Sequence, residues 1–380
     1  MSSPIRVGLM GLNRNTSTSN QVPGLWATKT HLPYILASPK FKLIAVCNST
    51  IESSQTAIKN HNLGPEVAAY GSPEDLAKDP NVDMVIISVM VGKHYMLAKP
   101  ALLAGKDIFV EWPLGASTAE AEEMAGLAKE HGCKTIVGLQ ARASPLIIKI
   151  KDLISSGKIG KVLSSTVISS FGGLPPGGMW PTGAEYYLDI NSGGTPLSIF
   201  FGHFLDSFVH VLGDFKVLKS SMRTDYPLVD IVDMSGNVLQ KDYRKTTPDG
   251  IQILGTLESG ASASIAYYTA TNPSIDGTGV RWMITGTKGQ IEVTTPESQW
   301  QMGPPGTVLK ARLGRGAEIE TIDFEDLVEV KEVNERVFPA VNTARQYEAF
   351  VEGRTRDFPD FEAAVKTHKL LDRVKEEAGW

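Results

Sequence analysis

Five short apolar runs in the first 140 residues constrain the fold more than any other feature of the sequence. They are IRVGLMG (5–11), FKLIAVCN (41–48), VDMVIISV (82–89), DIFVEW (107–112) and KTIVGLQ (134–140). Each run is almost continuously apolar, as are strands that are buried on both faces of a sheet. Helix-like segments separate them, for example residues 118–132, which are predicted to begin near Ser117 and to end at Gly132. This alternation predicts a doubly wound parallel sheet in an α/β domain.

The pattern changes after residue 160. Later runs alternate in polarity, and the turn signals SG (259–260) and KG (288–289) separate pairs of strands. We therefore expect a second, α+β domain with a large, mainly antiparallel sheet that has one packed face and one open face. The predicted domains are residues 1–142 and 143–380, with C-terminal helices at 341–378. The run GGLPPGGMWP (172–181) is interpreted either as a flap over a site or as a connector.

Length and composition agree with two globular domains. The chain has 380 residues, 42% of them hydrophobic, and a formal net charge of −5, which gives no reason to expect nucleic acid or an anionic membrane as a partner. The two cysteines, Cys47 and Cys133, are expected to be buried thiols in a reducing compartment. The longest apolar run, 84–91, is too short to span a bilayer. These features predict a cytoplasmic protein.

The end of the first strand predicts a dinucleotide site. Gly8 and Gly11 fit a tight turn that lets a pyrophosphate approach the next helix. The glycine fingerprint of a dinucleotide-binding turn is degraded in this chain. After Gly11 and Leu12, Asn13 stands where a second glycine is expected, and a polar insertion (14–24) replaces the third glycine. Asn tolerates a left-handed backbone better than most residues, so the turn is expected to survive.

The end of the second strand bears on which nucleotide is bound. An acid that holds the adenosine ribose is expected there, but the sequence has Asn48, Ser49 and Thr50. Without a carboxylate to repel a 2′-phosphate, NADP is favoured over NAD. No arginine follows in the sequence to bind that phosphate, so NAD stays open.

Five motifs follow one another along the chain: RVGLMGLN, WATKTHLPYI, VEWPLG, GLQARASP and GGTPLSIFFGHFLD. In this order the chain resembles the glucose–fructose oxidoreductase / inositol dehydrogenase (Gfo/Idh/MocA) family, and in particular its fungal branch that contains the galactose-regulon repressor. The resemblance implies a Rossmann domain, NAD(P) as the cofactor, a small-molecule substrate and a homodimer formed through the open sheet.

Two of the family's proton-handling residues are replaced in this chain. The family's redox enzymes carry Glu-Lys-Pro, but here Trp112 stands between Glu111 and Pro113, and Ile199 takes the place of an aspartate four residues before His203. An indole donates one hydrogen bond but delivers no proton at neutral pH. Either another residue supplies the proton, or the substrate needs none, or the chain performs no redox chemistry.

The resemblance and the strand ends together select the site residues. His203, Tyr187 and Asp189 are the candidate catalytic residues, although His203 also fits a core or capping role and Tyr186 and Tyr187 also fit plain packing. The remaining candidates for cofactor binding are Val89, His94, Glu111, Trp112, Gln140 and Arg142. For three of these another role is open: capping for His94, packing for Trp112 and a surface cation for Arg142. We assign no metal ligands.

These observations lead to one main hypothesis and two alternatives. The main hypothesis is an NAD(P)-dependent oxidoreductase that acts by hydride transfer on a small carbonyl, imine or sugar-like substrate. The first alternative is a catalytically silent NAD(P)-binding regulator that binds a protein partner. The second is a lyase, cyclase or isomerase that keeps the nucleotide as a scaffold.

Overall fold

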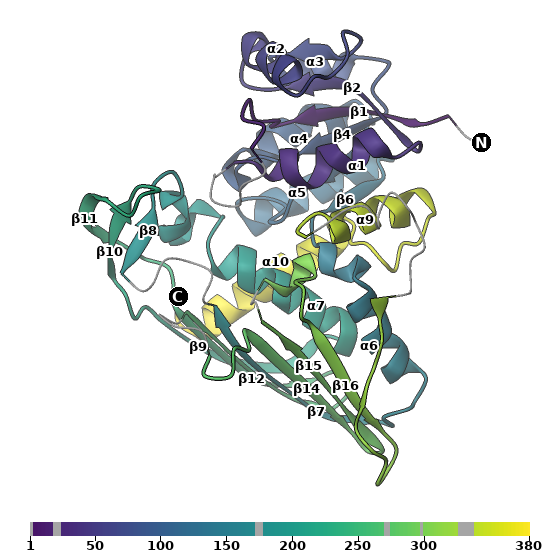
Figure 1. The fold of residues 1–380 in the computed structure, drawn as a ribbon, viewed down its shortest axis with the longest axis vertical. Coiled ribbons are helices and arrows are strands. Elements are labelled where there is room, and N and C mark those ends of the chain that lie inside the picture. Colours follow the sequence, from purple (N-terminus) through teal and green to yellow (C-terminus); the bar gives the residue numbers. More distant parts are fainter. Residues whose placement is uncertain (1–2, 18–23, 172–177, 270–273, 297–298, 326–337) are drawn as a thin grey trace. The chain divides into compact units, whose positions relative to one another are not determined.

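The structure is a computed structural model and describes residues 3–17, 24–171, 178–269, 274–296, 299–325 and 338–380. The chain forms two compact units (Figure 1). Unit 1 comprises residues 1–140, 192–194 and 330–368, and unit 2 comprises residues 141–191, 195–329 and 369–380. The assignment of a nucleotide role to 1–142 and a substrate role to 143–380 stays a prediction.

Unit 1 is built around a six-stranded parallel sheet in the order β3-β2-β1-β4-β5-β6. Its strands are β1 Ile5–Met10, β2 Phe41–Cys47, β3 Ala68–Tyr70, β4 Met84–Ile87, β5 Asp107–Val110 and β6 Thr135–Val137. The five strands predicted from apolar runs are present but end one to three residues earlier than predicted, because the residues beyond them form the loops at the carboxyl edge. The prediction missed β3, whose residues AAY are all only half-buried.

Helices cover the sheet of unit 1, and α4 packs against both α3 and α5. The helical segments are η1 Ala27–His31, α1 Leu32–Ala37, α2 Ile51–Asn60, α3 Pro73–Lys78, η2 Val91–Lys93, α4 His94–Leu103, α5 Thr118–Glu130, α9 Val341–Val351 and the first part of α10, Phe361–Glu377. Ser117 caps α5 by accepting a hydrogen bond from the Glu120 N–H, and Gly132 follows in the left-handed region, as predicted.

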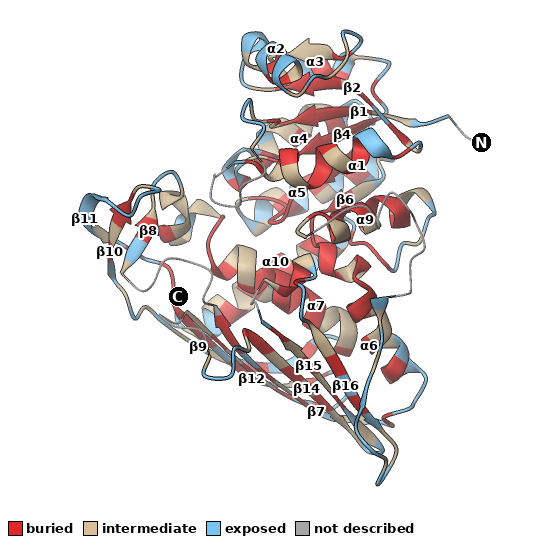
Figure 2. Cartoon of the chain, viewed as in Figure 1, coloured by how far each residue is buried: buried red, intermediate tan, exposed pale blue. Residues whose placement is uncertain are grey.

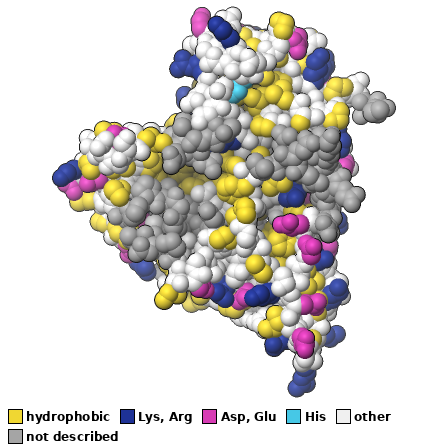
Figure 3. Space-filling view, viewed as in Figure 1, with side chains coloured by type: hydrophobic (Ala, Val, Ile, Leu, Met, Phe, Trp, Pro, Cys, Tyr) yellow, Lys and Arg dark blue, Asp and Glu magenta, His cyan; other side chains and the backbone are white. Residues whose placement is uncertain are grey.

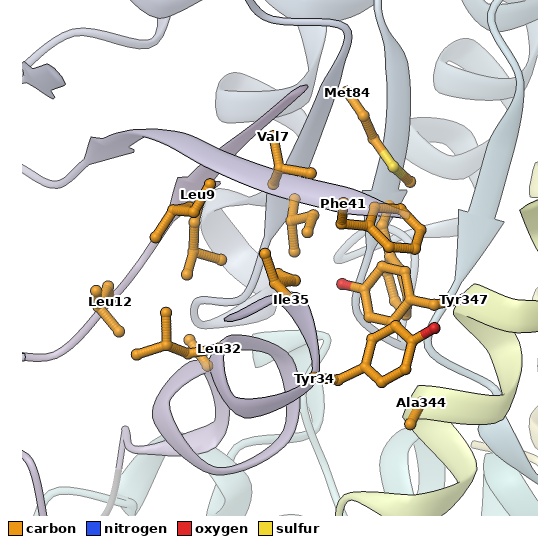
Figure 4. Packing of buried hydrophobic residues seen from close by; sticks show 14 of the residues in the cluster. Val7, Leu9, Leu12, Leu32, Tyr34, Ile35, Phe41, Met84, Ala344 and Tyr347 are labelled. Atoms are coloured by element: carbon orange, nitrogen blue, oxygen red, sulfur yellow. The ribbon is translucent and has the colours of Figure 1, made fainter. Parts of the chain in front are cut away.

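One face of the unit 1 sheet packs on residues that are distant in sequence. Val7, Leu9 and Phe41 belong to one buried cluster with Tyr34 of α1 and Tyr347 of α9, and the two tyrosine rings are stacked with their centroids 5.4 Å apart (Figure 4). The Gln346 side chain donates a hydrogen bond to the Val137 carbonyl, so α9 is also tied to the end of β6. The C-terminal residues thereby complete the core of the first unit.

Unit 2 contains an eight-stranded sheet in the order β17-β16-β15-β14-β7-β13-β12-β9, in which only the β7–β13 pair is parallel. Its strands are β7 Val162–Phe171, β9 Phe215–Arg223, β12 Gly250–Leu257, β13 Ser262–Thr269, β14 Val280–Gly286, β15 Gly289–Thr295, β16 Val308–Leu313 and β17 Glu320–Thr321. The predicted turns at 259–260 and 288–289 join β12 to β13 and β14 to β15. The predicted fold class, a parallel sheet followed by a mainly antiparallel one, is confirmed.

One face of this larger sheet is packed and the other is open (Figure 2). Along β14, Val280, Trp282 and Ile284 are buried while the residues between them are half-buried. Trp282 contacts Phe204 and Phe208, so helix α7 lies over the packed face. The remaining helical segments of unit 2 are η3 Gln140–Ala143 at its start, α6 Pro145–Ser155, η4 Glu185–Leu188, η5 Ile190–Ser192, η6 Leu197–Phe201, α7 Gly202–Leu212, η7 Trp300–Met302 and the end of α10.

A small three-stranded sheet stands beside the large one in unit 2. It consists of β8 Met179–Pro181, β10 Leu228–Val232 and β11 Val238–Arg244, in the order β11-β10-β8. Residues 172–177 of the predicted flap or connector lie outside the described residues, and 179–181 form β8.

On the face drawn in Figure 3, Lys and Arg side chains interleave with Asp and Glu side chains. Within the described ranges, no helix combines the length and the apolar character needed to cross a membrane.

Candidate functional site

Gly11 forms the turn at the carboxyl end of β1, and only glycine fits there. Its φ is +92°, and a Cβ at this position would lie 2.3 Å from the Ser88 carbonyl oxygen. The Gly11 N–H donates to the Cys47 carbonyl, which fixes the turn against the end of β2. Gly8 lies inside β1, where a Cβ would meet the Leu76 side chain at 2.9 Å. The two glycines thus differ: Gly11 shapes the turn, and Gly8 allows α3 to pack on β1.

The loop after Gly11 is held by side chains instead of further glycines. Asn48 donates to the Leu12 carbonyl at 2.9 Å, and the Asn13 carbonyl lies 2.8 Å from His61 Nε2. Asn60 donates to the Arg14 carbonyl at 2.9 Å. Asn13 does not use the left-handed backbone that asparagine tolerates, since among the described non-glycine residues only Asn62 and Asp242 have a positive φ. Residues 18–23 of the insertion lie outside the described residues.

The end of β2 presents hydroxyl groups and no carboxylate. Ser49 and Thr50 are exposed, and Thr50 caps α2 by accepting a hydrogen bond from the Ser53 N–H. Asn48 is engaged with the Leu12 carbonyl and is half-buried. Arg14 was not among the residues predicted from the sequence. It is exposed, and it lies two residues beyond the carbonyl that Asn48 binds. This cation belongs to the loop after the first strand, not to the residues after the second strand.

His94 joins two loops at the carboxyl edge of the sheet. It is the first residue of α4, it is 1% exposed, and its ring nitrogens lie 2.8 Å from the Pro113 carbonyl and 3.1 Å from the Val89 carbonyl. Burial lowers the pKa of His94, so the neutral ring is favoured. Both nitrogens face backbone oxygens, and this geometry gives His94 a structural role in connecting the ends of β4 and β5.

The segment Glu111–Pro113 follows β5 and contains the residue that replaces the family lysine. Trp112 is 5% exposed, its peptide bond to Pro113 is cis, and its ring centroid is 4.8 Å from that of His368. Glu111 accepts a hydrogen bond from His31 Nε2 at 2.7 Å. His31 was not among the residues predicted from the sequence. The one sequence feature that points to it is its position in the motif TKTHLPYI.

Gln140 shows an unfilled hydrogen-bonding capacity in unit 1. The residue is 1% exposed, and its side-chain oxygen Oε1 has no hydrogen-bond partner among the described residues. Buried polar atoms are nearly always paired, so such an atom near the end of β6 fits a ligand that supplies a donor. Together with the turn at Gly11, this atom shows that the residues present fit a dinucleotide.

In unit 2, His203 lies at the start of α7, directly after the π-helical turn η6. It is 6% exposed, and the residues before it on this segment, Ile199 and Phe200, are half-buried and apolar. Ile199 therefore supplies no carboxylate four residues before His203, where the resemblance implies an aspartate in the family's redox enzymes.

The other candidates of unit 2 have clear partners. Tyr187 stacks on Phe200 at 5.8 Å and contacts Tyr186 at 4.4 Å between ring centroids, and burial raises the pKa of Tyr187. Asp189 is exposed, and its carboxylate accepts a hydrogen bond from the Asn191 N–H at 3.0 Å. Arg142 forms a two-point ion pair with Asp206. Tyr187 thus contacts Phe200, three residues before His203, and Arg142 binds Asp206, three residues after His203 on α7. Asp189 is engaged with the backbone of its own loop.

The strand order of unit 1 and its glycine-only turn define a protein of the dinucleotide-binding Rossmann class. Residues 22–139 match the model of the oxidoreductase family with an NAD-binding Rossmann fold (GFO_IDH_MocA), and residues 145–295 match the model of the Gal80p C-terminal domain. The chain belongs to the Gfo/Idh/MocA family, with a C-terminal domain of the Gal80p type.

Individual relatives fall into two groups. The dehydrogenase aclE of Aspergillus oryzae is 28% identical over 98% of this chain and 96% of its own length. The galactose/lactose metabolism regulatory protein GAL80 of Saccharomyces cerevisiae is 33% identical over 68% of this chain, a match that spans 59% of GAL80. The crystal structure of a super-repressor mutant of Gal80p from the same yeast superposes with a TM-score of 0.85 at 26% identity, covering 99% of this chain and 96% of that one.

Proposed function

We propose that this chain is an NAD(P)-dependent oxidoreductase that transfers hydride to or from a small carbonyl, imine or sugar-like substrate. The observation that carries the proposal is the turn at Gly11, where the φ of +92° and the approach to the Ser88 carbonyl leave no room for a side chain. Such a turn brings backbone close to a pyrophosphate. A relative matched over 96% of its own length and named a dehydrogenase supports the same activity.

The nucleotide would be held by residues at the carboxyl edge of the unit 1 sheet. The turn Gly11–Leu12–Asn13 would approach the pyrophosphate, Ser49 would bind the adenosine ribose, and Gln140 Oε1 would accept a hydrogen bond from the ligand. The bound nicotinamide would supply the hydride chemistry.

NADP is the proposed preference. The missing carboxylate at the end of β2 removes a repulsion against a 2′-phosphate, and the exposed Ser49, Thr50 and Arg14 offer hydroxyl groups and a cation in its place. An arginine near this position is a common way to accommodate that phosphate.

His203 is the proposed proton-handling residue on the substrate side, with Tyr187 and Asp189 as weaker candidates. A general acid is needed only when an alkoxide would otherwise form. The apolar Ile199 and Phe200 before His203 favour a substrate with an apolar or planar electrophilic group over one that presents many hydroxyls.

The test is a nucleotide titration followed by single-turnover reduction. NADPH and NADH binding is measured by fluorescence, and a panel of sugars, aldehydes, ketones and cyclic imines is then added to the complex. Oxidation of NADPH by any panel member supports the proposal. The variant His203→Ala should then lose turnover and keep nucleotide binding, while a variant that turns over at the wild-type rate would remove His203 from its assigned role.

The second candidate function is a silent regulator that binds nucleotide and a protein partner. Its specific support is the Gal80p-type C-terminal domain over residues 145–295, together with the loss of both proton handlers at Trp112 and Ile199. Tight NADPH binding with an inert nicotinamide across the panel would favour this function, or a non-redox reaction on the same scaffold, over the oxidoreductase.

A homodimer through the open face of the large sheet is also proposed. Ile168 and Leu254 point to that face and are 45% and 63% exposed. Leu254→Asp is expected to convert a dimer into a monomer in light scattering, because it places a charge in an apolar contact.

A further inference from the structure

Three aromatic rings of unit 2 lie side by side and remain partly exposed. Tyr187 contacts Tyr186 with ring centroids 4.4 Å apart, and it stacks on Phe200 at 5.8 Å with an angle of 14° between the ring planes. All three residues are half-buried, whereas Trp180, whose ring is 5.9 Å from that of Tyr187, is 5% exposed. We call Tyr186, Tyr187 and Phe200 the aromatic wall.

Hydrogen bonds fix the turn that carries the two tyrosines of the aromatic wall. Thr246 donates its N–H to the Leu188 carbonyl at 2.9 Å, at the end of η4. Trp180 Nε1 donates to the Ala184 carbonyl at 2.7 Å, just before η4 begins. Both ends of the turn are therefore held, and a preorganised surface loses less conformational entropy when a ligand binds.

Carboxylates stand next to the aromatic wall. Asp189 follows η4 directly, three residues after Tyr186, and side chains three residues apart in a 3₁₀ turn lie one above the other. Asp189 is exposed, and its carboxylate accepts a hydrogen bond from the Asn191 N–H at 3.0 Å. Glu185, the first residue of η4, places a second carboxylate on the same turn.

The segment that carries the aromatic wall is free of basic residues other than histidine. Residues 162–215 contain no lysine and no arginine. Their acidic residues are Glu185, Asp189, Asp206 and Asp214. Lys245, next to the Thr246 that holds η4, is 8% exposed and forms an ion pair with Asp249.

Two further cations contact this segment from elsewhere in unit 2. Arg142 forms its two-point ion pair with Asp206. Lys151 contacts His210 near the end of α7, whereas Phe200 precedes the start of that helix. Among the described residues of the segment, the charges beside the aromatic wall are therefore those of carboxylates.

This combination recognises a planar cation. The π face of an aromatic ring attracts a positive charge, and stacked rings favour a flat ligand. A neighbouring carboxylate adds to the attraction and repels an anionic substrate. A sugar, which presents hydroxyl groups on every side, would leave the apolar ring faces without a matching partner.

We propose that the aromatic wall and Asp189 bind the substrate as an iminium cation, whose planar carbon–nitrogen double bond carries the positive charge. This inference rests on the proposed oxidoreductase function and names its substrate class. In the reaction, the hydride of NADPH forms a C–H bond at the iminium carbon and NADPH is oxidised to NADP⁺. The π electron pair moves to nitrogen, which becomes a neutral amine.

Such a substrate agrees with the two replaced proton handlers. Hydride addition to an iminium creates no alkoxide, so neither a lysine at Trp112 nor an aspartate at Ile199 is required. For an imine that arrives uncharged, His203 is the proposed source of the proton on nitrogen.

The first experiment measures binding by calorimetry, without turnover and both with and without NADPH. The probes are N,N-dimethyl tetrahydroisoquinolinium, a permanent and unreactive cation, and dimethyltetralin, its uncharged carbon isostere. The cation should bind at least about tenfold more tightly than the isostere, since the ring faces and a carboxylate both favour the charge.

Matched variants assign this preference to the aromatic wall and to Asp189. Tyr187→Leu and Phe200→Leu keep apolar bulk without a π face, and each should weaken binding of the cation about two- to thirtyfold. Tyr187→Phe keeps the ring and should bind the cation like the wild type. Asp189→Asn should weaken binding about two- to fivefold. Asp214→Asn, which removes another exposed carboxylate of the segment, is the control and should change nothing.

The second experiment follows turnover with N-methyl dihydroisoquinolinium. It should oxidise NADPH faster with the protein than in buffer alone. Asp189→Asn should raise KM for this cation and leave KM unchanged for a neutral aldehyde or ketone that the protein reduces. An equal change for charged and neutral substrates would assign Asp189 a structural role and overturn its part in the inference.

The outcomes separate the inference from the proposed function. Equal affinity for the cation and its isostere would overturn the inference, as would unchanged cation binding in folded Tyr187→Leu and Asp189→Asn variants. Oxidation of NADPH by neutral carbonyl compounds would still leave the oxidoreductase intact in that case. Selective binding of the cation without oxidation of NADPH by any compound would instead overturn the oxidoreductase and leave recognition of a cation standing.

Discussion

Arg142 and Asp206 form a two-point ion pair in unit 2, with Nη2–Oδ1 at 2.6 Å and Nε–Oδ2 at 2.9 Å. The Asp206 side chain is 1% exposed and that of Arg142 is 14% exposed. This pair fixes η3 against α7, and it explains why a basic residue just after the first domain is retained inside the fold instead of on its surface.

Breaking this pair should strongly destabilise the protein. Asp206→Ala leaves the Arg142 guanidinium without its buried partner, which costs about 3–5 kcal/mol in the free energy of unfolding. The double variant Arg142→Met with Asp206→Leu removes both charges and should recover most of the loss. Urea denaturation measures both, and a loss below about 1 kcal/mol in Asp206→Ala would show that the pair contributes little.

His210 should make stability pH-dependent on the acid side. Burial, followed by the nearby Arg142 and Lys151 cations, lowers the pKa of His210 from 6.5 to about 3, and Lys151 Nζ lies 2.8 Å from its Nε2. Because the folded pKa is below the unfolded value, the unfolded chain takes up the proton first as the pH falls. Stability should therefore be lost between pH 6.5 and about 3.

The variant His210→Gln tests this dependence. It should reduce the slope of unfolding free energy against pH in that window by up to about 1.4 kcal/mol per pH unit. Above pH 7 the two proteins should show the same slope. Parallel curves across the whole acid range would contradict the assignment.

Gly11→Ala should abolish nucleotide binding. The added Cβ would lie 2.3 Å from the Ser88 carbonyl oxygen at a φ of +92°, so the turn has to rearrange. Gly126→Ala is the matched control, because Gly126 is exposed within α5 and a Cβ there meets nothing within 4 Å. The control should keep its affinity and gain about 0.5–1 kcal/mol in stability. Fluorescence titration and thermal unfolding separate the two effects.

Arg14→Gln should weaken NADPH binding about ten- to a hundredfold, the size of one lost charge-assisted hydrogen bond. Affinity for NADH, which lacks the 2′-phosphate, should stay unchanged. Lys59→Gln serves as a control, since it removes another exposed cation from the nearby end of α2. An equal loss for both nucleotides would argue against phosphate recognition by Arg14.

Trp112→Ala should destabilise unit 1 by about 3–5 kcal/mol, because a large buried side chain leaves a cavity. Trp112→Phe retains a ring to contact His368 and should cost less. If Trp112 acts only in packing, Trp112→Phe keeps the turnover rate of the wild type. A selective loss of turnover in a stable Trp112→Phe variant would instead give the indole a direct role at the site.

Local patterns were sufficient for much of the fold. The five apolar runs became β1, β2, β4, β5 and β6, because burial on both faces leaves a continuous signal in the sequence. The half-buried β3 leaves no such signal. The turn at Gly11 was also predicted, since the steric demand of a positive φ is a local property.

The candidate site was harder to predict, because its contacts join distant segments. Asp189 and Arg142 were chosen for their chemistry, but the first is bound to the Asn191 backbone and the second to Asp206, 64 residues away. The loop that carries Arg14 is held by Asn48 and Asn60, from the end of the next strand and from the next helix, and no local pattern shows these contacts.

The sequence by itself determined the class of fold, the glycine turn and the replacement of a lysine by Trp112, because each depends on residue type and short spacing. The tertiary structure decided which polar groups meet. His31 lies 80 residues from Glu111 and 316 residues from Tyr347 in sequence, yet their side chains form one hydrogen-bonded chain. No local pattern encodes such a chain, since it exists only after η1, β5 and α9 pack around one core and exclude water from the groups between them.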